Sequence, residues 1–273
     1  MPFALLDEAY DLGAALFAQA EEIKRSYLGG ARGYAPFRTE HAKNRSEPDL
    51  KEFWQIGPER ANGDTRTGDG PEETQPHNIW PESPAGFKQT FLTLFDALQD
   101  TGRMILEALT PALRLPAGFF EPLVRDRNSV LRLLHYPPVP ADVDSVSVRS
   151  AAHEDINLIT LLPAPRGPGL ELLDRNGVWL PVNATWNELI VDSGDMLARM
   201  TNDVIPATTH RVVNPAEANS SRYTMPFFVH PNSDVILSCL ASCVGTGAKY
   251  ADITAGAFLE QRLREIGLTG GRP

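Results

Sequence analysis

The stretch His153-Glu-Asp-Ile-Asn-Leu-Ile-Thr-Leu-Leu162 joins a polar His-x-Asp triplet to a short apolar run. The apolar part, from Ile156 to Leu162, has the length and the aliphatic residues that favour a buried β-strand. On an extended backbone, residues i and i+2 point to the same side, so His153 and Asp155 can reach one common ligand. The stretch therefore predicts a strand with two ligating side chains near its end.

Similar short apolar runs recur from residue 129 onwards, with turn-forming residues such as Asp174-Arg-Asn-Gly177 between them. Roughly seven or eight short strands with this spacing fit a double-stranded β-helix, the jelly-roll architecture. The runs are Val130–His135, Ile156–Leu162, Leu170–Leu173, Val178–Val182, Leu189–Val191, Met196–Met200 and Tyr223–Val229.

Helical spacing of apolar residues appears on both sides of this region. It predicts a helix over 4–27, a second one capped by Ser83 with Pro84 at its first position, and a last one over 255–266. Residues 29–80 are rich in Gly, Pro and charge and predict an irregular arm, with a loop at 62–70. The expected fold is mainly β with flanking helices: 1–125 helical and irregular, 126–235 the jelly-roll core, and 236–273 a C-terminal extension with a helix.

A set of possible iron ligands emerges when a third residue is added to the His-x-Asp triplet. His153, Asp155 and the distant His210 supply two imidazoles and one carboxylate, which can bind iron(II) on one face and leave the opposite face open. Open positions on the metal are what a cosubstrate, dioxygen and water require. Since His210 is far along the chain, we expect it to come from a strand that lies beside the first.

An anion-binding pair follows the second histidine. Arg222 and Thr224 are again i and i+2, so their guanidinium and hydroxyl share one face of a strand. The planar guanidinium matches a carboxylate and stays charged at any working pH. Tyr136, in His135-Tyr136-Pro137, precedes the whole set.

Several segments in combination resemble the isopenicillin N synthase-like branch of the iron(II)/2-oxoglutarate dioxygenases, bacterial members included. The resemblance runs over most of the chain, and the segments that carry it are 33–37, 49–54, 78–81, 131–138, 153–162, 194–196, 201–202, 210–215 and 222–228. It implies that His153, Asp155 and His210 bind Fe(II). It also implies that Arg222 and Thr224 bind the distal carboxylate of 2-oxoglutarate and that Tyr136 contacts the cosubstrate or the substrate.

The same resemblance implies the reaction: with Fe(II), 2-oxoglutarate and O2, the enzyme would oxidise a C–H bond of a small organic substrate, with hydroxylation as the expected outcome, and release succinate and CO2. The substrate would be a carboxylate, an amino-acid derivative or a secondary metabolite. Weaker candidates for substrate contacts are Arg32, Tyr34 and Arg38 in the arm, and Phe228 in a late strand.

Two departures from the family pattern stand out. Plant members often carry Asn two residues before the tyrosine, where this chain has Leu134, so one hydrogen bond to the cosubstrate is expected to be absent. Family chains usually have a strand and a helix ahead of the first helix here, so the N-terminal part is expected to be truncated, which would leave a sheet edge uncovered.

Other polar residues close to the motifs are interpreted as structural. Asn157, Asp195 and Asn202 could orient the metal ligands, but Asn and Asp are typical turn formers, and turn chemistry is favoured for all three. Cys239 and Cys243 are expected to be packing residues, because no further Cys or Cys-His pattern completes a zinc set.

The composition narrows the classes of partner. The formal net charge is −10 and Lys and Arg are scattered, so no basic face for a nucleic acid is indicated. No apolar run reaches membrane-spanning length, and the first residues lack the layout of a signal peptide. We expect a cytoplasmic protein with no nucleic-acid or membrane partner.

Three alternative functions share parts of this pattern. An isopenicillin N synthase-type oxidase would use Arg222 and Thr224 to bind the carboxylate of its own substrate and would need no 2-oxoglutarate. A non-catalytic jelly-roll binding protein could keep the metal as a structural clip, although structural sites usually fill every coordination position. A zinc hydrolase could use the same His and Asp ligands but would not need the Arg222–Thr224 pair.

Overall fold

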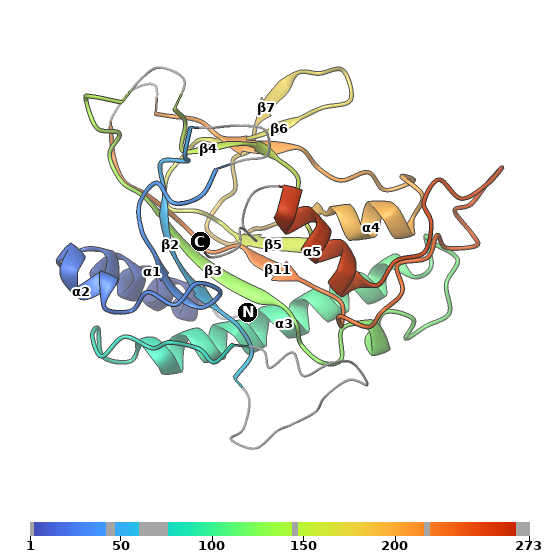
Figure 1. Ribbon diagram of the computed structural model, residues 1–273, viewed down its shortest axis with the longest axis horizontal. Coiled ribbons are helices and arrows are strands. Elements are labelled where there is room, and N and C mark those ends of the chain that lie inside the picture. Colours follow the sequence, from blue (N-terminus) through green and yellow to red (C-terminus); the bar gives the residue numbers. More distant parts are fainter. Residues whose placement is uncertain (1–2, 42–46, 60–75, 144–146, 216–218, 266–273) are drawn as a thin grey trace.

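The computed structural model describes residues 3–41, 47–59, 76–143, 147–215 and 219–265. The expected loop at 62–70 lies outside these ranges. Within them the chain forms two antiparallel β-sheets with helices on the outside (Figure 1). This is the mainly β jelly-roll arrangement that the strand spacing predicts. No described helix is long and apolar enough to cross a membrane.

The larger sheet has the strand order β1-β2-β3-β11-β5-β8, with β10 also paired to β3. Its strands are β1 (Gly33–Ala35), β2 (Glu52–Ile56), β3 (Val130–Tyr136), β5 (Ile159–Pro163), β8 (Leu189–Ser193), β10 (Arg222–Thr224) and β11 (Phe227–Val229). The smaller sheet has the order β4-β9-β6-β7. Its strands are β4 (Ser150–His153), β6 (Leu170–Leu173), β7 (Trp179–Pro181) and β9 (His210–Val212).

The alternation of side chains along each strand separates two apolar clusters. On β2, Phe53 points to a small cluster that also holds Tyr136 and Val212, residues from both sheets. Its neighbour Trp54 points to the opposite side, into the main core. We call the side of the larger sheet that carries Phe53 the inner face, because it lies toward the smaller sheet.

Helices cover the outer side of the larger sheet. The helices α1 (Phe3–Phe17) and α3 (Phe87–Leu109) pack against each other, and α3 runs along β11 and β5 (Figure 1). The buried stripe of α3 includes Phe87, Phe91 and Phe95 at helical spacing, so these aromatic residues are core residues, as their spacing predicts.

Gly102 allows α3 to lie this close to the sheet. A Cβ at this position would be 2.8 Å from Cγ2 of Val229 on β11. In an open helical position a Gly-to-Ala change stabilises a protein by about 1 kcal/mol, but overpacking a core costs about 1–3 kcal/mol. We therefore expect Gly102→Ala to lower the free energy of unfolding in urea titrations by up to about 2 kcal/mol. A variant more stable than the wild type would contradict this close packing.

The first half of the chain differs from expectation in three places. The helix expected over 4–27 is two helices, α1 and α2 (Glu21–Arg25), and α3 begins at Phe87 with Gly86, not Ser83, before it. Gly86 has φ 86°, a left-handed conformation that favours glycine. The arm at 29–80, expected to be irregular, contributes β1 and β2 to the larger sheet. β2 is stabilised by pairing with β3, and β1 by pairing with β2, which local composition does not reveal.

Two of the predicted strands are also corrected. The run Met196–Met200 is a helix, α4 (Asp195–Met200). A run this short, apolar except for Arg199, has no period that separates a strand from a buried helix. The run Tyr223–Val229 is divided into β10 and β11 at Met225–Pro226, where proline cannot donate a hydrogen bond to a neighbouring strand.

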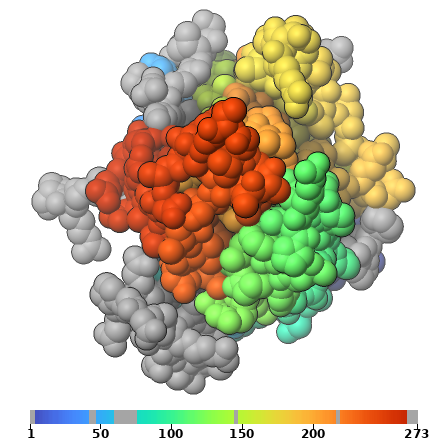
Figure 2. Space-filling model, turned by 90° about the vertical axis from the view of Figure 1, so that its right-hand side faces the viewer, coloured from blue at the N-terminus to red at the C-terminus, as the bar shows by residue number. Residues whose placement is uncertain are grey.

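The C-terminal residues wrap around one end of the molecule. The side chain of Asn232 accepts a hydrogen bond from the backbone of Asp126 (2.9 Å) and donates to the carbonyl of Pro122 (3.0 Å). The C-terminal segment and helix α5 (Ala255–Glu265) therefore lie beside the region before β3, red and orange next to green in Figure 2. The helix predicted over 255–266 is confirmed over 255–265.

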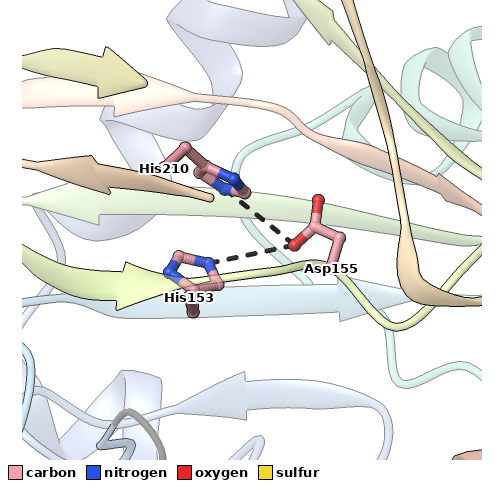
Figure 3. Close-up of side chains that lie close together, drawn as sticks. All are labelled: His153, Asp155 and His210. Atoms are coloured by element: carbon pink, nitrogen blue, oxygen red, sulfur yellow. Dashed lines mark ion pairs between the residues drawn. The ribbon is translucent and has the colours of Figure 1, made fainter. Parts of the chain in front are cut away.

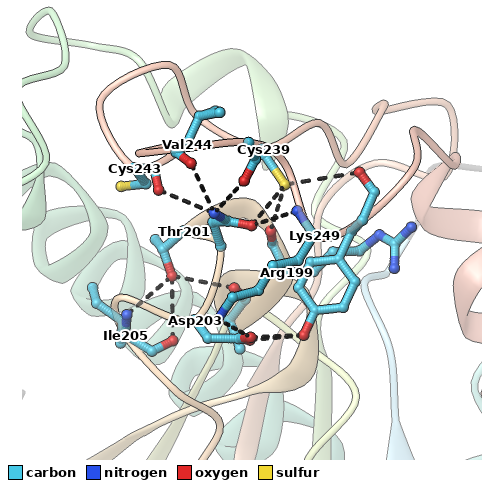
Figure 4. A network of polar contacts seen from close by, with 12 residues as sticks. Arg199, Thr201, Asp203, Ile205, Cys239, Cys243, Val244 and Lys249 are labelled. Carbon is cyan, nitrogen blue, oxygen red and sulfur yellow. Dashed lines mark hydrogen bonds and ion pairs between the residues drawn. The ribbon is translucent and has the colours of Figure 1, made fainter.

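Asn202 attaches this segment to α4. It has φ 53°, and its amide donates to the carbonyls of Cys243, Val244 and Gly247 while accepting from the backbone of Lys249 (Figure 4). Turn chemistry is thus confirmed for Asn202. Cys239 and Cys243 are free thiols in this contact region.

Candidate active site

The two histidines of the candidate metal site face each other across a strand pair. His153 ends β4 and is directly opposite His210, the first residue of β9. Asp155 follows β4, and its Oδ1 lies 3.8 Å from Nε2 of His153 and 4.0 Å from Nε2 of His210 (Figure 3). One ligand atom from each of the three residues lies within 4.8 Å of the others, so within the described residues these three side chains could hold a metal ion.

The Nδ1 atom of each imidazole is hydrogen-bonded to a backbone carbonyl. Nδ1 of His153 lies 2.7 Å from the carbonyl of Ala151, and Nδ1 of His210 lies 3.0 Å from the carbonyl of Thr208. A carbonyl only accepts, so both rings carry their proton on Nδ1. This tautomer leaves the Nε2 lone pairs free and directs them at the space beside Asp155, which is how metal-binding histidines are usually oriented.

Burial and mutual charge set the protonation of the three groups. Burial, helped by the neighbouring His210, lowers the pKa of His153 to about 4. Burial alone would raise the pKa of Asp155, but His210 and His153 lower it below its usual value. Burial alone would lower the pKa of His210, but the charge of Asp155 raises this pKa above its usual value. A charged carboxylate beside a neutral His153 is a protonation state suited to a metal ion.

Thr160 and Asn157 position the carboxylate. The hydroxyl of Thr160, on β5, donates a short hydrogen bond to Oδ2 of Asp155, and the amide of Asn157 donates to Thr160 Oγ1 at 2.7 Å. Asn157 lies in a bend, as turn chemistry predicts, and its side chain in addition holds Thr160, which donates to Asp155. Thr160 was missed, although a lone hydroxyl in the apolar strand after the motif was the available signal.

The loop that carries Asp155 is fixed from α4. The backbone of Asp195 donates to the carbonyl of Asp155 (2.8 Å), and a Cβ at Gly194 would lie 2.3 Å from the Asn157 side chain. The side chain of Asp195 pairs with Arg262 of α5 at 2.8 Å instead of acting in a turn. Asp195 therefore links the metal-site loop to the C-terminal helix.

We expect Thr160→Val to weaken iron(II) binding by about 10- to 100-fold, the usual cost of removing a partner of a metal ligand. The substitution keeps the shape of the side chain but leaves Asp155 Oδ2 without its donor. A competition titration with a fluorescent iron chelator measures the change. Thr160→Ser restores the hydroxyl and should recover most of the affinity, whereas wild-type affinity in the valine variant would show that this hydrogen bond is not needed.

A second group of candidate residues lies where β10 pairs with β3. Arg222 is opposite Tyr136, and Thr224 is opposite Leu134. The guanidinium carbon of Arg222 lies 5.2 Å from the centre of the Tyr136 ring. The pairing therefore brings Arg222, Thr224 and Tyr136 together, while Leu134 belongs to the apolar cluster on the inner face.

Arg222 is buried without a counter-ion. The residue is 1% exposed, and its Nε and Nη1 have no partner; neither has Oγ1 of Thr224. Within the described residues no carboxylate pairs with this guanidinium. Burial lowers the pKa of Arg222. Unpaired buried charge is costly, so an anion bound by Arg222 and Thr224 would satisfy groups that the protein itself leaves open.

The weaker substrate candidates are dispersed. Tyr34 is buried in the main core, where its hydroxyl donates to Glu52, and Arg38 is exposed and stacks on Phe37 at 5.8 Å. Within the described part of the chain, neither Tyr34 nor Arg38 forms a hydrogen bond, ion pair or ring contact with His153, Asp155 or His210. Phe228 is on the inner face, with the guanidinium of Arg132 at 5.6 Å from its ring. Arg32 is also buried near this face, as described below.

The charge of Asp155 also affects the pKa of two residues that the sequence did not single out, Asp192 and His230. Asp192 on β8 is opposite Thr160, and burial together with the charge of Asp155 raises its pKa to about 7. Burial lowers the pKa of His230, just after β11, to about 4, and Asp155 acts against this shift. Each is partly buried, with one side-chain atom that is buried without a partner in the described residues, and neither is part of a recognisable local motif.

Comparisons with known proteins agree with this geometry. The family model of the 2OG-Fe(II) oxygenase superfamily matches residues 127–231, and that of the N-terminal region of non-haem dioxygenases in morphine synthesis matches residues 1–83. A 2-oxoglutarate-Fe(II) type oxidoreductase of Emericella nidulans is 33% identical over 82% of this chain. The match covers 65% of that relative, so this chain spans about two thirds of its length.

Solved structures show the same fold over nearly the whole chain. A 2OG-Fe(II) oxygenase family protein from Caulobacter crescentus is 44% identical with a TM-score of 0.85, and the match covers 97% of this chain and 87% of that one. A Neurospora crassa protein in complex with alpha-KG and thymine is 28% identical with a TM-score of 0.83, covering 97% and 84% of the two chains. The chain belongs to the 2OG-Fe(II) oxygenase superfamily, the family of iron(II)- and 2-oxoglutarate-dependent dioxygenases.

Proposed function

We propose that this protein is a dioxygenase that hydroxylates a C–H bond of a small organic substrate. In this proposal His153, Asp155 and His210 hold iron(II), and Arg222, Thr224 and Tyr136 hold 2-oxoglutarate. Family membership supports both assignments, and the donor set itself fits the metal, because two imidazoles and one carboxylate on one face leave the remaining positions open.

The buried, unpaired Arg222 is the observation that carries the proposal. A structural arginine at this depth would be paired, but here Nε, Nη1 and the adjacent Thr224 hydroxyl all lack a partner. A dicarboxylate with one end on the metal and the other on Arg222 would satisfy them. Tyr136 then offers a ring wall next to the guanidinium, 5.2 Å from its carbon.

Each of these residues has a defined task in the reaction. The Nδ1 hydrogen bonds of both histidines and the Thr160 hydroxyl keep the ligands in place before the metal arrives, and Arg222 orients the cosubstrate through its planar fork. The bound iron and 2-oxoglutarate supply the oxidising chemistry, in which 2-oxoglutarate becomes succinate and CO2 while one oxygen atom of O2 enters the substrate.

Similar proteins support a small substrate. The Neurospora crassa protein has been crystallised with thymine, a molecule small enough to fit within a jelly roll. By analogy we place the substrate of this chain on the inner face, beside the iron ligands.

An anaerobic titration tests the proposal. Fe(II) followed by 2-oxoglutarate is added to the metal-free protein, and visible absorption is recorded. We expect a weak charge-transfer band that requires both additions, and succinate formation once air is admitted. Tight Fe(II) binding with no effect of 2-oxoglutarate would instead favour an oxidase that uses its substrate's own carboxylate, and absence of Fe(II) binding would contradict the metal site.

A further inference from the structure

Two further guanidiniums are buried without an acidic partner in the described residues: that of Arg149, which donates to the carbonyl of Ser220, and that of Arg32, which donates to its own neighbour Ala31. Arg32, just before β1, is 7% exposed. Within the described residues it forms no ion pair; its Nη1 donates to the carbonyl of the adjacent Ala31 (2.7 Å), and its Nε is buried without a partner. Burial lowers the pKa of Arg32 to about 10, which still leaves it charged at neutral pH. A buried charge without a partner is costly, and a bound anion would compensate it.

Gly57 shows on which side of the sheet this charge lies. Successive residues of β2 alternate, so Phe53, Gln55 and the position of Gly57 all face inward. A Cβ at Gly57 would lie 2.3 Å from Nη2 and 2.4 Å from Nε of Arg32. The guanidinium thus occupies the space that a side chain at 57 would fill on the inner face. Asn78 holds the backbone of Gly57 in place through hydrogen bonds of 2.8 and 2.9 Å.

Polar and aromatic residues of the inner face surround Arg32 and its neighbour Gln55. The side chain of Gln55 donates to the carbonyl of Ala31 (2.8 Å) and accepts from Nε of Arg132 (3.1 Å). Arg132 is stacked between Phe53 (4.3 Å) and Phe228 (5.6 Å). Its charge is balanced by Glu40 at 3.1 Å, whereas that of Arg32 has no such partner in the described chain.

His230 connects this wall with the metal site. It is two residues beyond Phe228 on the continuation of the same strand, so it faces inward as well. The charges of Asp155, Arg132 and Arg32 all act on its ring. Its Nδ1 is buried and has no hydrogen-bond partner among the described residues. The inner face therefore carries the candidate iron ligands, the unpaired Nδ1 of His230 and the unpaired guanidinium of Arg32.

We propose that Arg32 binds an acidic group of the substrate, so that the enzyme acts on organic acids whose carboxylate lies at Arg32 and whose reactive carbon lies at the iron site. This inference rests on the proposed function for the identity of the reaction. It assigns the substrate class from the chain's own unpaired charge. The aromatic rings of Phe53 and Phe228 add apolar contact for the carbon skeleton between the two ends.

A carboxylate is favoured over a neutral ligand because no acidic side chain of the described residues pairs with Arg32. A neutral amide or sugar would leave the buried charge uncompensated, and the pairing of a guanidinium with a carboxylate is strong and directional. A purely structural arginine would be expected to have its buried donors satisfied. Arg38, exposed in the same arm, lacks this environment.

Thermal unfolding with matched ligand pairs tests the inference. Protein loaded with Fe(II) and 2-oxoglutarate under nitrogen is heated with benzoate, hydrocinnamate or hexanoate, and with the corresponding primary amides. We expect at least one acid, and no matching amide, to raise the unfolding temperature of the wild type. Arg32→Met should weaken binding of that acid by about 30-fold or more, as loss of one partner of a buried charge pair implies. Arg38→Met is the matched control and should bind it normally.

Stability without the acids separates this role from a structural one. If Arg32 is an unpaired binding group, Arg32→Met should unfold at the same temperature as the wild type or higher when no acid is present. A lower unfolding temperature would indicate a structural role and overturn the inference. So would equal protection by acids and amides, no protection by any acid, or unchanged acid binding in Arg32→Met.

The same experiment keeps the two proposals apart. Protection by 2-oxoglutarate should be retained in Arg32→Met and lost in Arg222→Met. If 2-oxoglutarate fails to protect even the wild type, the proposed function is contradicted. If 2-oxoglutarate protects as expected but the acids do not depend on Arg32, only the substrate class is wrong.

Discussion

Asp155→Ala is expected to weaken iron(II) binding by more than about 100-fold, since even loss of an outer partner of a ligand costs about 10- to 100-fold. The substitution leaves His153 and His210 as two neutral ligands on adjacent strands with no negative charge between them. Hydroxylation should be abolished. Calorimetric titration with Fe(II) under nitrogen, followed by a succinate assay, measures both effects.

Asp192→Asn is the matched control for this variant. Asp192 is also a buried carboxyl group near the metal site, with a pKa raised to about 7, but it is not one of the three clustered ligands. We expect it to retain iron binding within about tenfold, below the usual upper cost of an outer partner. Full activity in Asp155→Ala, or greater loss in Asp192→Asn, would show that the ligand set has been assigned to the wrong carboxylate.

Arg222→Met is expected to weaken 2-oxoglutarate binding by about 30-fold or more, because truncating a buried charge pair costs about 2–5 kcal/mol. Iron(II) binding should be unchanged, since Arg222 is not among the clustered ligands. The dissociation constant follows from the anaerobic charge-transfer titration. The protein without ligands should not lose stability, because the substitution removes a buried charge that has no partner in the described residues.

Thr224→Val provides the graded comparison for Arg222→Met. It removes one neutral donor and keeps the shape, so the loss should be about fivefold, corresponding to a net hydrogen bond of about 1 kcal/mol. A larger effect of the valine variant than of the methionine variant, or unchanged 2-oxoglutarate affinity in Arg222→Met, would contradict the assignment of the anion site.

Local patterns predicted the candidate ligand pairs but not their surroundings. His153 and Asp155 are two residues apart at a strand end, and Arg222 and Thr224 have the same spacing in β10, so side-chain alternation alone places each pair on one side. The neighbours that orient them come from elsewhere in the chain. Thr160 reaches Asp155 from β5, and Gly194 leaves space for that loop from the start of α4.

The errors in secondary structure have a common physical origin. The strands β1 and β2 lie in a Gly- and Pro-rich arm and exist because β3 pairs with β2 residue by residue. The helix α4 is short, with four apolar residues that a strand could also have, and the surrounding loop contacts decide between the two. Pairing partners far along the chain, not local propensity, determined these elements.

By itself, the sequence determined the jelly-roll class, the three candidate metal-binding side chains and the candidate anion-binding pair, because these depend on residue type and on the two-residue period of a strand. Only the tertiary structure decided which charges remain unpaired. Arg32, Arg38 and Arg132 have the same side chain, yet one is exposed, one is balanced by Glu40, and one is buried beside Gly57 with no acidic partner in the described chain. Burial and partners are properties of the folded state, and they distinguish a binding residue from a surface one.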